Sequence, residues 1–439
     1  MTELERLIEE YCPNGVEYKT LGELGAFYGG LSGKSKDDFV DGNAKFITYM
    51  NVFSNIELNL DTKDTVQIGE NEKQNTIEYG DVLFTGSSET PDECGMSSVL
   101  TKHTEEKLYL NSFCFGFRFY DKELILPGFS KYLFRSEALR KQIKKTASGV
   151  TRFNVSKKKM EKVTIPIPPV EVQREIVRIL DNFAELTAEL TAELTARKKQ
   201  YEYYRDSLLT FGVHRRGTVE TKWRTLGEVC NSIADGDHMP PPKSDSGIPF
   251  ITISNITEQN KVDFSNTMFV PCAYYNALAE KRKPQKGDIL YTVVGSYGIP
   301  VCIENETEFV FQRHIAILRP KMQIINPRYM YHAMQTTAFK AQADKAAKGA
   351  AQKTISLHSL SEMTLPVPSL EVQERLIDVL DHFDAICSDL NIGLPAEIEA
   401  RKKQYEYYRD MLLTFAAADD IILTDRQTDR QTDRQTELN

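Results

Sequence analysis

The segment ARKKQYEYYRD at residues 196–206 occurs a second time, without a single change, at residues 400–410. The repetition reaches further back in each half, because TLGE at residues 20–23 returns at residues 225–228. Internal duplication constrains a fold more strongly than any local motif, since each copy has to form a similar unit. Two copies are present, not the array of a solenoid. We therefore expect two similar halves, each with a globular part that differs between the copies and a tail that does not.

The tail of each half is predicted to be a long helix. After Pro168-Pro169, residues 170–211 contain neither Gly nor Pro and are rich in strong helix formers, so a helix of about 60 Å is expected. Its apolar residues recur every three or four positions, as in a seam for a second helix. The second tail, residues 370–415, offers a matching seam with a predicted break at residues 393–395, and we expect antiparallel pairing. The seams are Ile176, Leu180, Phe183, Leu186, Leu190 and Leu194, and Leu376, Leu380, Phe383, Ile386 and Leu390.

The globular parts are predicted to be α+β. Short apolar runs bounded by Gly, Asn, Asp or Pro predict strands at residues 46–49, 82–85, 113–119, 163–167, 250–253, 289–294, 315–318 and 363–367. Residues 129–145 and 329–345 are each predicted to form one amphipathic helix, followed by a loop at Gly149 or Gly349. The expected architecture is two α/β domains joined by two long antiparallel helices, with an internal pseudo-two-fold repeat. The predicted boundaries are residues 1–167, 168–211 (first helix), 212–367, 368–415 (second helical region) and 416–439 (tail).

Composition excludes several classes of protein. The seven cysteines are scattered without a C-x-x-C pair, and no histidine has the spacing of a metal ligand beside them. This pattern is typical of a reduced cytoplasmic protein without a metal site. No run approaches the roughly 18 apolar residues that a membrane helix requires. We therefore expect a cytoplasmic location and no membrane attachment.

Positive charge is concentrated in one segment, although the formal net charge of the chain is −9. Residues 140–162 contain nine basic side chains against one acid, Glu161. Such clusters contact nucleic-acid phosphates without reading sequence. A solvated helix face and loop is the alternative interpretation. The basic residues are Arg140, Lys141, Lys144, Lys145, Arg152, Lys157, Lys158, Lys159 and Lys162, and the second half has a weaker counterpart in Lys340, Lys345, Lys348 and Lys353.

Several short motifs stand out in the two halves. They are IPIPP at residues 165–169 with Gln173, LPVP at 365–368 with Gln373, CPNGVEY at 12–18, GGLSGKS at 29–35 and the doubled ARKKQYEYYRD. Together they resemble the DNA-specificity (S) subunit of Type I restriction-modification systems. The resemblance covers the chain to about Phe415 and is strongest in the predicted helices.

The resemblance implies two target-recognition domains, each reading one half of a split site in double-stranded DNA. The long helices would set the gap between the half-sites and bind two methyltransferase (M) subunits. Methylation of adenine N6 and ATP-dependent cleavage would belong to the M subunits and to restriction (R) subunits. This chain would then hold no cofactor itself, with S-adenosylmethionine, ATP and magnesium on the partner subunits.

The chain's own motifs indicate that it is not the enzyme. Residues 33–35 (GKS) look like the end of a phosphate-binding loop, but Tyr28 stands where G-x-x-x-x-G-K-[ST] requires glycine. An adenine methyltransferase of this kind would carry Asn or Asp before Pro-Pro and an aromatic residue, an order absent around Pro168-Pro169 and residues 240–242. Acidic pairs such as Asp37-Asp38 are usually solvated. We predict no catalytic residues and no metal ligands.

Base edges in DNA are read by Arg, Lys, Asn, Gln, Ser or Thr side chains, whereas a loop residue at any one position can equally well make only turn hydrogen bonds. The predicted DNA-binding residues are Lys34, Ser35, Lys36, Ser87, Ser88, Thr151, Arg152 and Asn154 in the first half, and Asp237, His238, Lys243, Ser296, Tyr297, Lys348, Gln352 and Lys353 in the second. The predicted partner interface comprises Gln173, Arg197, Lys198, Tyr201, Tyr204, Gln373, Arg401, Lys402, Tyr405 and Tyr408. Tyrosines on a long helix are assigned to packing and to this interface, not to base stacking.

The first long helix also contains a shorter period, because Thr-Ala-Glu-Leu occurs twice in residues 187–194. From Asp181 to Ala196 the chain advances 15 positions, whereas from Asp381 to Ala400 it advances 19, so the first helix lacks one such unit. Four helical residues correspond to about 6 Å, or between one and two base pairs at about 3.4 Å each. We hypothesise that the number of units sets the spacer between half-sites. A generic helical filler is the alternative.

The end of the chain repeats Thr-Asp-Arg-Gln over residues 424–435 and is too polar to pack, so it is predicted to be a disordered tail. A tetranucleotide GACA repeated in frame would encode it, which suggests a slippery tract that varies the protein's end. The codons themselves would test this.

Two other classes of protein remain as alternatives. A free-standing transcription regulator would use the same basic clusters but has no need of two long helices with an identical segment. A coiled-coil linker has no need of divergent loops with localised positive charge. Co-purification with a methyltransferase subunit would distinguish the three.

Overall fold

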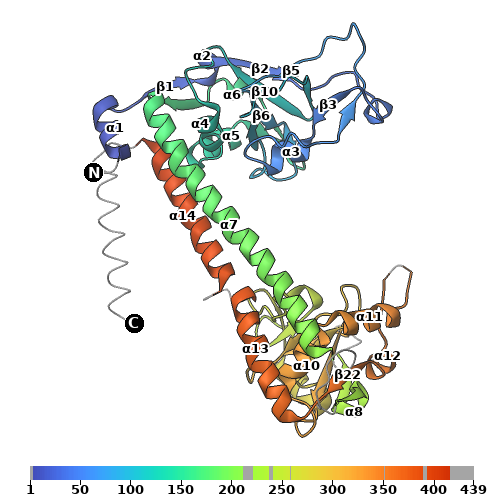
Figure 1. The fold of residues 1–439 in the computed structure, drawn as a ribbon. Helices are drawn as coiled ribbons and strands as arrows, with labels where there is room; N and C mark the ends of the chain where they lie inside the picture. The colour runs from blue at the N-terminus through green and yellow to red at the C-terminus, as the bar shows by residue number, and fades with distance from the viewer. Residues whose placement is uncertain are drawn as a thin grey trace. The chain divides into compact units, whose positions relative to one another are not determined.

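The computed structural model describes residues 3–210, 221–236, 241–257, 259–350, 352–388 and 393–415 (Figure 1). Its contacts divide the chain into two compact units. Unit 1 comprises Met1–Glu189 and Glu399–Asn439, and unit 2 comprises Leu190–Ile398. Each unit therefore contains one globular part together with helical segments from both repeats.

Unit 1 is built mainly on two four-stranded sheets, with strand orders β2-β10-β6-β8 and β4-β3-β9-β5. Smaller sheets pair β1 with β13 and order β11-β12-β7. Its elements are α1 (Glu3–Tyr11), β1 (Glu17–Thr20), α2 (Leu21–Leu24), β2 (Gly25–Gly29), η1 (Asp37–Phe39), β3 (Ala44–Ile47), α3 (Tyr49–Ser54), β4 (Thr65–Val66), β5 (Thr76–Ile77), β6 (Val82–Thr85), β7 (Ser87–Ser88), β8 (Ser97–Val99), β9 (Leu108–Leu110), β10 (Cys114–Phe119), α4 (Pro127–Leu133), α5 (Glu137–Lys144), β11 (Ala147–Ser148), β12 (Phe153–Val155), α6 (Lys157–Met160) and β13 (Thr164–Ile167).

Unit 2 repeats the main sheet with the order β15-β21-β18-β19, beside a three-stranded sheet β17-β16-β20 and the pair β14-β22. Its elements are β14 (Lys222–Thr225), α8 (Leu226–Val229), β15 (Cys230–Asp235), β16 (Ile248–Ile251), η2 (Ile253–Asn255), β17 (Met268–Val270), α9 (Cys272–Ala277), η3 (Glu280–Arg282), β18 (Ile289–Thr292), β19 (Pro300–Cys302), β20 (Val310–Phe311), β21 (Ile315–Pro320), α10 (Pro327–Met334), α11 (Thr337–Ala346), α12 (Leu357–Ser361) and β22 (Thr364–Val367).

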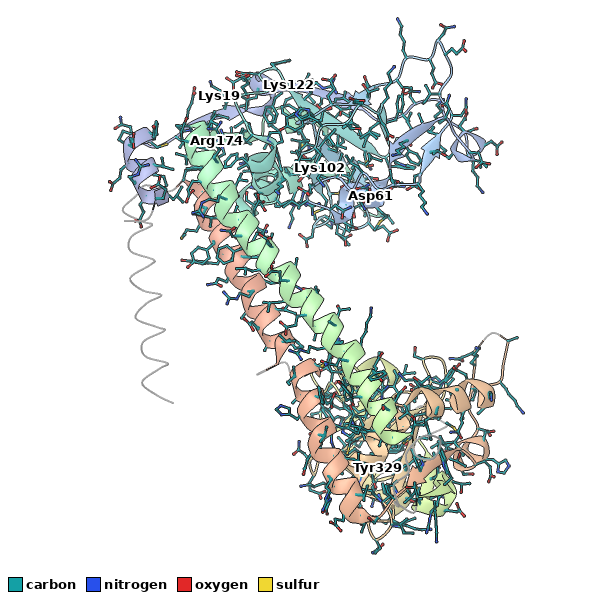
Figure 2. The ribbon with its side chains drawn as sticks, in the orientation of Figure 1. Lys19, Asp61, Lys102, Lys122, Arg174 and Tyr329 are labelled. Atoms are coloured by element: carbon teal, nitrogen blue, oxygen red, sulfur yellow. The ribbon has the colours of Figure 1, made fainter. Side chains whose placement is uncertain are left out.

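The predicted fold class is confirmed, since both units combine helices with mainly antiparallel sheets and the long helices are present. The strand predicted at residues 82–85 coincides with β6, and the other predicted strands overlap β3, β10, β13, β16, β18, β21 and β22. These strands succeed as predictions because most of their apolar residues are buried. Figure 2 labels one core residue of unit 2, Tyr329 in α10, whose hydroxyl donates to the Pro366 carbonyl at 2.8 Å.

A Gly-Asp pair precedes the central strand in both units. Gly80 and Gly287 have φ of +86° and +88°, a conformation that glycine adopts without steric cost. The aspartates that follow are 1% and 2% exposed, and a buried carboxylate is stable only when it is paired. The pairs are Asp81 with Arg118 at 2.7 Å and Asp288 with Arg319 at 2.8 Å. The repeated motif is therefore explained by a buried carboxylate that pairs with a partly exposed arginine of the neighbouring strand.

The single helices predicted at residues 129–145 and 329–345 are wrong in one respect, because each is two helices, α4 with α5 and α10 with α11. The buried hydroxyl of Ser136 donates to the Leu133 carbonyl at 2.7 Å. Thr336 donates in the same way to the Ala333 carbonyl at 2.8 Å. Such side-chain bonds compete with the helical backbone and favour a new helix start, which periodicity alone does not reveal.

The long helices are α7 (Val170–Leu209), α13 (Leu370–Ser388) and α14 (Leu394–Thr414). α7 runs without interruption for 40 residues, as predicted. The predicted break in the second tail is confirmed at Gly393, since α14 starts immediately after it with Pro395 in its first turn, where proline is tolerated. Residues 389–392, and with them Leu390 of the predicted seam, lie outside the described residues.

Within each unit the paired helical segments run antiparallel (Figure 1). In unit 1, Phe183 of α7 stacks on Tyr408 of α14 with ring centroids 5.3 Å apart. In unit 2, Tyr204 of α7 stacks on Phe383 of α13 at 5.8 Å. Of the predicted seam on α7, Ile176 and Leu180 are fully buried, Phe183, Leu190 and Leu194 are half-buried, and Leu186 is 47% exposed.

The identical ARKKQYEYYRD segments attach to the globular parts in the same way. In unit 1, the second copy places Asp410 so that its carboxylate accepts from the Glu137 amide at the start of α5, at 2.7 Å. In unit 2, the first copy places Asp206 so that it accepts from the Thr337 amide at the start of α11, at 3.2 Å. A carboxylate at a helix N-terminus satisfies an otherwise unpaired amide. The globular part of unit 1 is therefore held by the second copy of the segment, and the globular part of unit 2 by the first copy.

Gln173 and Gln373, predicted as partner contacts, are instead fully buried. The carboxamide of Gln173 accepts from the Leu126 amide at 2.8 Å and donates to the Leu124 and Pro168 carbonyls at 2.9 and 2.7 Å. Gln373 makes the corresponding bonds with Asn326, Ile324 and Pro368. Both side-chain amides thus satisfy buried backbone groups, which explains why the motif occurs in both halves. Their predicted role as partner contacts is therefore wrong.

Candidate nucleic-acid interface

Two predicted DNA-binding stretches of unit 1 lie side by side on one small sheet. β12 pairs with β7, with Phe153 opposite Ser88 and Asn154 opposite Ser87. β11 pairs with the other edge of β12, with Ser148 opposite Asn154. Residues 86–88 and 147–155 are therefore one structure, which we call the edge sheet of unit 1.

Unit 2 builds the same structure with different residues. The Ile355 amide donates to the Val293 carbonyl at 2.8 Å, and the Gly295 amide donates to the Lys353 carbonyl at 3.0 Å. Thr354 forms antiparallel bridges with both Val294 and Lys348. We call residues 293–297 and 348–355 the edge sheet of unit 2, with Ala351 outside the described residues.

The tight turn within each edge sheet requires glycine. Gly149 has φ of +150° and Gly349 has φ of +124°. A Cβ atom on Gly149 would lie 1.9 Å from the Arg152 carbonyl oxygen, and one on Gly349 would lie 2.3 Å from that of Gln352. In both loops the carbonyl of the residue three positions after the glycine approaches that glycine closely, so Arg152 and Gln352 occupy equivalent positions.

Arg152 is exposed but held in place. Its Nε and Nη2 donate to the hydroxyl of Ser87 at 3.1 and 2.9 Å. Its guanidinium lies 5.4 Å from the centre of the Phe113 ring, which is itself 57% exposed. Ser87 and Ser88 are 6% and 8% exposed, so they support the site instead of forming its surface. Thr151 and Asn154 are exposed, as predicted residues at a DNA surface should be.

Phe113 was missed by sequence reasoning, because its apolar character placed it inside a predicted strand. The signal that could have found it is its position directly after the polar pair Asn111-Ser112. In unit 1 the Gly86 amide of the edge sheet donates to the Phe113 carbonyl at 2.7 Å, and in unit 2 the Val293 amide donates to the His314 carbonyl at 2.8 Å. His314 and its exposed neighbour Arg313 therefore lie beside the edge sheet of unit 2 and were also missed.

The loop that contains Lys34, Ser35 and Lys36 belongs to a different part of unit 1. The Lys34 ammonium lies 2.5 Å from both the Glu72 carboxylate and the Gln67 carbonyl, and its side chain is 8% exposed. Ser35 donates to the Asp38 carboxylate at 2.7 Å. Lys34 is therefore committed to a buried ion pair in this structure, whereas Lys36 is exposed.

The predicted residues of unit 2 divide in the same way. Lys243, Ser296, Lys348, Gln352 and Lys353 are exposed. The hydroxyl of Tyr297 donates to the Asp344 carboxylate at 2.9 Å. Asp237 and His238 lie outside the described residues.

The basic cluster of residues 140–162 separates into structural and exposed members. Arg140 is 9% exposed and donates to the Gly95, Cys94 and Asp92 carbonyls, and burial lowers the pKa of its guanidinium. Its predicted place in the basic surface is therefore wrong. Lys141 and Lys144 pair with Glu137 at 2.6 Å and Asp92 at 2.7 Å. Lys145, Arg152, Lys157, Lys158, Lys159 and Lys162 are exposed and form no ion pair among the described residues.

The short helix α6 concentrates this exposed charge next to the edge sheet. It follows β12 after one residue, and Met160 is fully buried while its three lysines face solvent. The corresponding helix α12 of unit 2 carries Leu357, His358 and Ser359 at the same positions. This region of unit 1 therefore carries more positive charge for binding phosphates than the equivalent region of unit 2.

Replacing Lys158 by Ala is expected to weaken DNA binding about equally for all sequences and to reduce the slope of log K against log salt by about one, because a lysine at a phosphate reads no base. Anisotropy titrations of the chain with its partner subunits at several salt concentrations would measure both quantities. Lys141→Ala is the matched control, since Lys141 is already paired with Glu137. A change in the preferred sequence with Lys158→Ala would contradict a phosphate role.

The predicted partner-interface residues on the long helices are only partly exposed. Tyr201 is 6% exposed, and its hydroxyl lies 2.9 Å from Nδ1 of His332. Tyr405 packs edge-on against Tyr132 at 6.3 Å. Both tyrosines therefore attach the helices to the globular parts, as expected of packing residues, and Tyr201 is too deeply buried to form a partner surface. Arg197, Lys198, Tyr204 and Lys402 are exposed, and Arg401 and Tyr408 are half-buried.

The identical segments also expose one further tyrosine at matching positions. Tyr203 is 69% exposed and Tyr407, its equivalent, is 45% exposed. Exposed tyrosines at matching positions of two helices are typical of an interface, because tyrosine is enriched in such surfaces.

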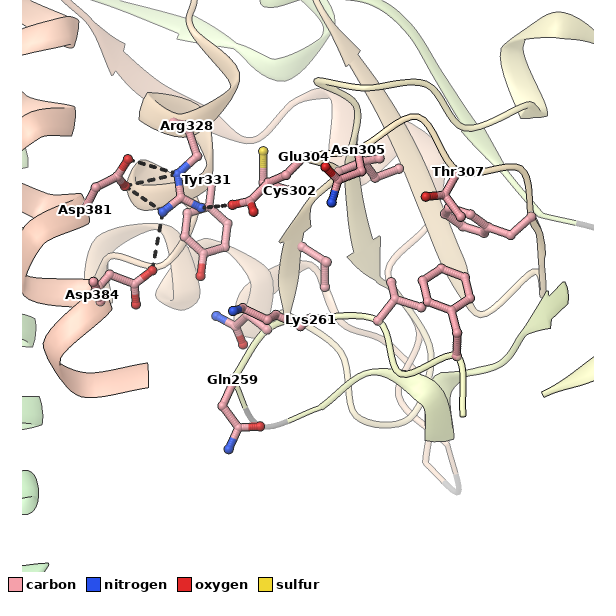
Figure 3. A pocket seen from close by; sticks show the side chains of 17 residues that line it. Gln259, Lys261, Cys302, Glu304, Asn305, Thr307, Arg328, Tyr331, Asp381 and Asp384 are labelled. Atoms are coloured by element: carbon pink, nitrogen blue, oxygen red, sulfur yellow. Dashed lines mark hydrogen bonds and ion pairs between the residues drawn. The ribbon is translucent and has the colours of Figure 1, made fainter. Parts of the chain in front are cut away.

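A cavity of about 350 Å³ lies in unit 2 between α10, α13 and the loops at residues 259–264 and 302–309 (Figure 3). Arg328 extends into it and pairs with Asp381 at 2.6 Å, Glu304 at 3.1 Å and Asp384 at 3.4 Å. Burial raises the pKa of the Cys302 thiol to about 12, so this cysteine is a poor nucleophile. Arg328 and its three carboxylate partners satisfy one another, and the arrangement is that of a structural network.

His332 lies behind this network and predicts an acid sensitivity of unit 2. It is fully buried, its Nε2 lies 2.6 Å from the Asp381 carboxylate, and burial lowers its pKa below the ordinary 6.5. Between these two pKa values His332 is protonated in the unfolded chain but neutral in the folded protein. The free energy of unfolding therefore decreases as pH falls from about 6.5 toward the pKa of His332 in the folded protein.

The variant His332→Tyr is expected to lose this component of acid sensitivity. Unit 1 has Tyr132 at the equivalent position, where its hydroxyl donates to Asp181 at 2.5 Å. Chemical denaturation of the wild type and the variant between about pH 5 and 7.5 would measure the difference. An unchanged pH dependence would exclude His332 as its source.

Three further observations describe the chemistry available to the described residues. They contain no group of three or more His, Cys, Asp or Glu side chains that could hold a metal ion. Among them there is also no helix long and apolar enough to span a membrane. All seven cysteines are free thiols.

Comparison with known proteins identifies the family. Residues 13–197 and 218–400 match the Type I restriction modification DNA specificity domain. The chain is 31% identical over 282 residues to a putative type I restriction enzyme specificity subunit of Haemophilus influenzae, with 61% of this chain and 68% of the relative covered. It is 33% identical over 292 residues to the EcoR124I/EcoR124II specificity subunit of Escherichia coli, with 61% of this chain and 66% of the relative covered.

The fold is also found in a solved structure described as the basis of complex assembly and conformational transition of the type I R-M system. The two chains share 18% identity with a TM-score of 0.63, over 92% of this chain and 98% of the other. The resemblance noted in the sequence is thus confirmed, and with it the expectation that the chain is not itself the enzyme. With two copies of the matching domain and the edge sheet built in each unit, this chain belongs to the family of Type I restriction-modification DNA specificity subunits.

Proposed function

We propose that this chain reads a split site in double-stranded DNA, one half-site with each unit. The observation that carries the proposal is the edge sheet, which both units build with the same backbone and different exposed side chains. A scaffold that is kept while its surface diverges is what the recognition of two different sequences requires. The exposed lysines of α6 beside the first edge sheet supply the phosphate contacts that orient a protein on DNA.

The proposed partners are two methyltransferase subunits and the restriction subunits of the same system. The duplicated segments expose matching residues, Lys198 with Lys402 and Tyr203 with Tyr407, which suit two copies of one partner. Methylation of adenine N6 and ATP-dependent cleavage would take place on those subunits, which would hold S-adenosylmethionine, ATP and magnesium. A complex that acts on chromosomal DNA in this way would work in the cytoplasm.

Methylome sequencing tests this proposal directly. The full chain would be co-expressed with its methyltransferase subunit in a host that lacks other adenine methylation. The expected result is one split motif with adenine methylated on both strands, and no such motif when the chain is omitted. A continuous motif, or methylation that does not depend on the chain, would refute the proposed function.

A further inference from the structure

The edge sheets offer two side chains that are equivalent in position and different in chemistry. Arg152 follows Gly149 by three residues, and Gln352 follows Gly349 by three residues. In each loop the carbonyl of that residue closes the turn over the glycine, at the distances that exclude a Cβ atom. The backbone therefore presents Arg152 and Gln352 in the same way, and only the side chains distinguish the two surfaces.

Two of the N–H donors of Arg152 bind Ser87, and two others are left to bind a ligand. Nε and Nη2 both donate to the single oxygen of Ser87, which occupies the side edge of the guanidinium. The end of the fork, formed by Nη1 and the second hydrogen of Nη2, has no partner among the described residues. The guanidinium carbon also lies 5.4 Å from the centre of the Phe113 ring, a cation–π contact that helps to hold the group in place. A planar pair of donors fixed on an exposed loop matches the O6 and N7 acceptors of guanine.

Gln352 has the complementary chemistry. Its side chain is exposed, and its Nε2 would lie 3.5 Å from a Cβ built on Gly295, so the amide lies close to Gly295 of the edge sheet. Val294 stands where unit 1 has Ser87, and it offers no hydroxyl to bind the amide. A free carboxamide carries one donor and one acceptor side by side, which matches N7 and N6 of adenine. The neighbouring Lys353 is a point charge that suits a phosphate better than a base.

We infer that Arg152 reads a guanine in the first half-site and that Gln352 reads an adenine in the second. This inference rests on the proposed function and specifies two of its base contacts. Ser87 and Phe113 are positioning residues for Arg152, since they act on the base only through its orientation.

Modified bases test the inference with the unaltered protein. In the wild-type complex, 7-deazaguanine at one guanine of the first half-site is expected to weaken binding about tenfold, because it removes the N7 acceptor. 7-Deazaadenine at one adenine of the second half-site is expected to have a similar effect. A first half-site without guanine, or one in which no such replacement matters, would overturn the assignment of Arg152. A second half-site without adenine, or one in which no 7-deazaadenine replacement weakens binding, would overturn the assignment of Gln352.

Exchange of the side chains gives a second, independent test by methylome sequencing. Arg152→Gln is expected to change or relax one position of the first half-site by about tenfold or more and to leave the second half-site unchanged. Gln352→Arg should do the reverse. The unaffected half-site shows that the variant is folded, and Arg152→Lys keeps the charge while removing the planar fork. Ser87→Ala should weaken the same guanine preference without creating a new one.

The two hypotheses fail in different ways. A wild-type complex that yields no split motif would refute the proposed function. A split motif that stays the same at both half-sites in Arg152→Gln, Arg152→Lys and Gln352→Arg would refute only the base assignments. Lys145→Ala is a matched control in the same exposed region, because a phosphate contact should change affinity without changing the motif.

Discussion

Deleting residues 191–194 from α7 is expected to shorten the preferred spacer between the half-sites by one to two base pairs and to abolish methylation of the original site. Four helical residues correspond to about 6 Å along the helix and to a rotation of about 40° beyond a full turn. Base pairs are about 3.4 Å apart, so a chain shortened in this way would present its second reading surface out of register with the old site. Adding one Thr-Ala-Glu-Leu unit should lengthen the spacer by the same amount.

The structure makes this segment a suitable place for such a change. The border between the two units falls at Glu189 and Leu190, inside the repeated Thr-Ala-Glu-Leu units. Residues 191–193 are exposed, unlike Ile176 and Leu180 earlier in the helix, which are fully buried. Removing one unit therefore takes little packed surface away from either unit.

Methylome sequencing of the deletion, the insertion and the wild type would measure the spacer. Replacing residues 191–194 by four alanines is the length-matched control, because it keeps the helix and removes only the Thr-Ala-Glu-Leu sequence. The same spacer in the deletion and the wild type would show that the units are only helical filler.

Tyr201→Ala is expected to destabilise unit 2 by about 3–5 kcal/mol, because it removes a large buried aromatic side chain and leaves a cavity. The hydroxyl of Tyr201 also lies 2.9 Å from His332, so the truncation removes a partner of a buried polar group. Tyr203→Ala, two residues away in the same helix, is expected to change stability by less than about 0.5 kcal/mol, because its ring is 69% exposed. Chemical denaturation followed by circular dichroism would compare the two variants.

The same pair of variants separates attachment within the chain from binding to a partner. Tyr203→Ala and Tyr407→Ala should together weaken co-purification with the methyltransferase subunit while the chain stays folded. Tyr201→Ala should reduce co-purification only as far as it unfolds unit 2. If Tyr203→Ala with Tyr407→Ala bound the partner as well as the wild type, the exposed tyrosines would not belong to the interface.

Much of the candidate site could be predicted from sequence because its residues lie on loops beside predicted strands. Thr151, Arg152, Asn154, Gln352 and Lys353 were found in this way and are all exposed. Phe113 was missed because apolar residues near a strand are usually buried. Asp237 and His238 stay predictions, as does the disordered tail, because they lie outside the described residues.

The errors of prediction share one physical cause. Lys34, Arg140 and Gln173 have the charge or polarity of surface residues, yet each satisfies a buried group that lies tens of positions away in the chain. The local sequence shows which hydrogen bonds or ion pairs a side chain is able to form. Whether the side chain is buried depends on which distant segment packs over it. The break between α4 and α5 is the exception, because it depends on a local hydrogen bond from the Ser136 hydroxyl to the Leu133 carbonyl three residues earlier.

The sequence by itself determined the duplication, the α+β class, the long helices with their break near Gly393, and the family. These follow from periodicity and repetition, which are properties of the chain alone. Only the tertiary structure decided that each identical ARKKQYEYYRD segment holds the globular part of the other half, through Asp206 and Asp410, and that Arg152 and Gln352 occupy equivalent places. Those relations join residues remote in sequence, and such contacts form only when packing brings the segments together.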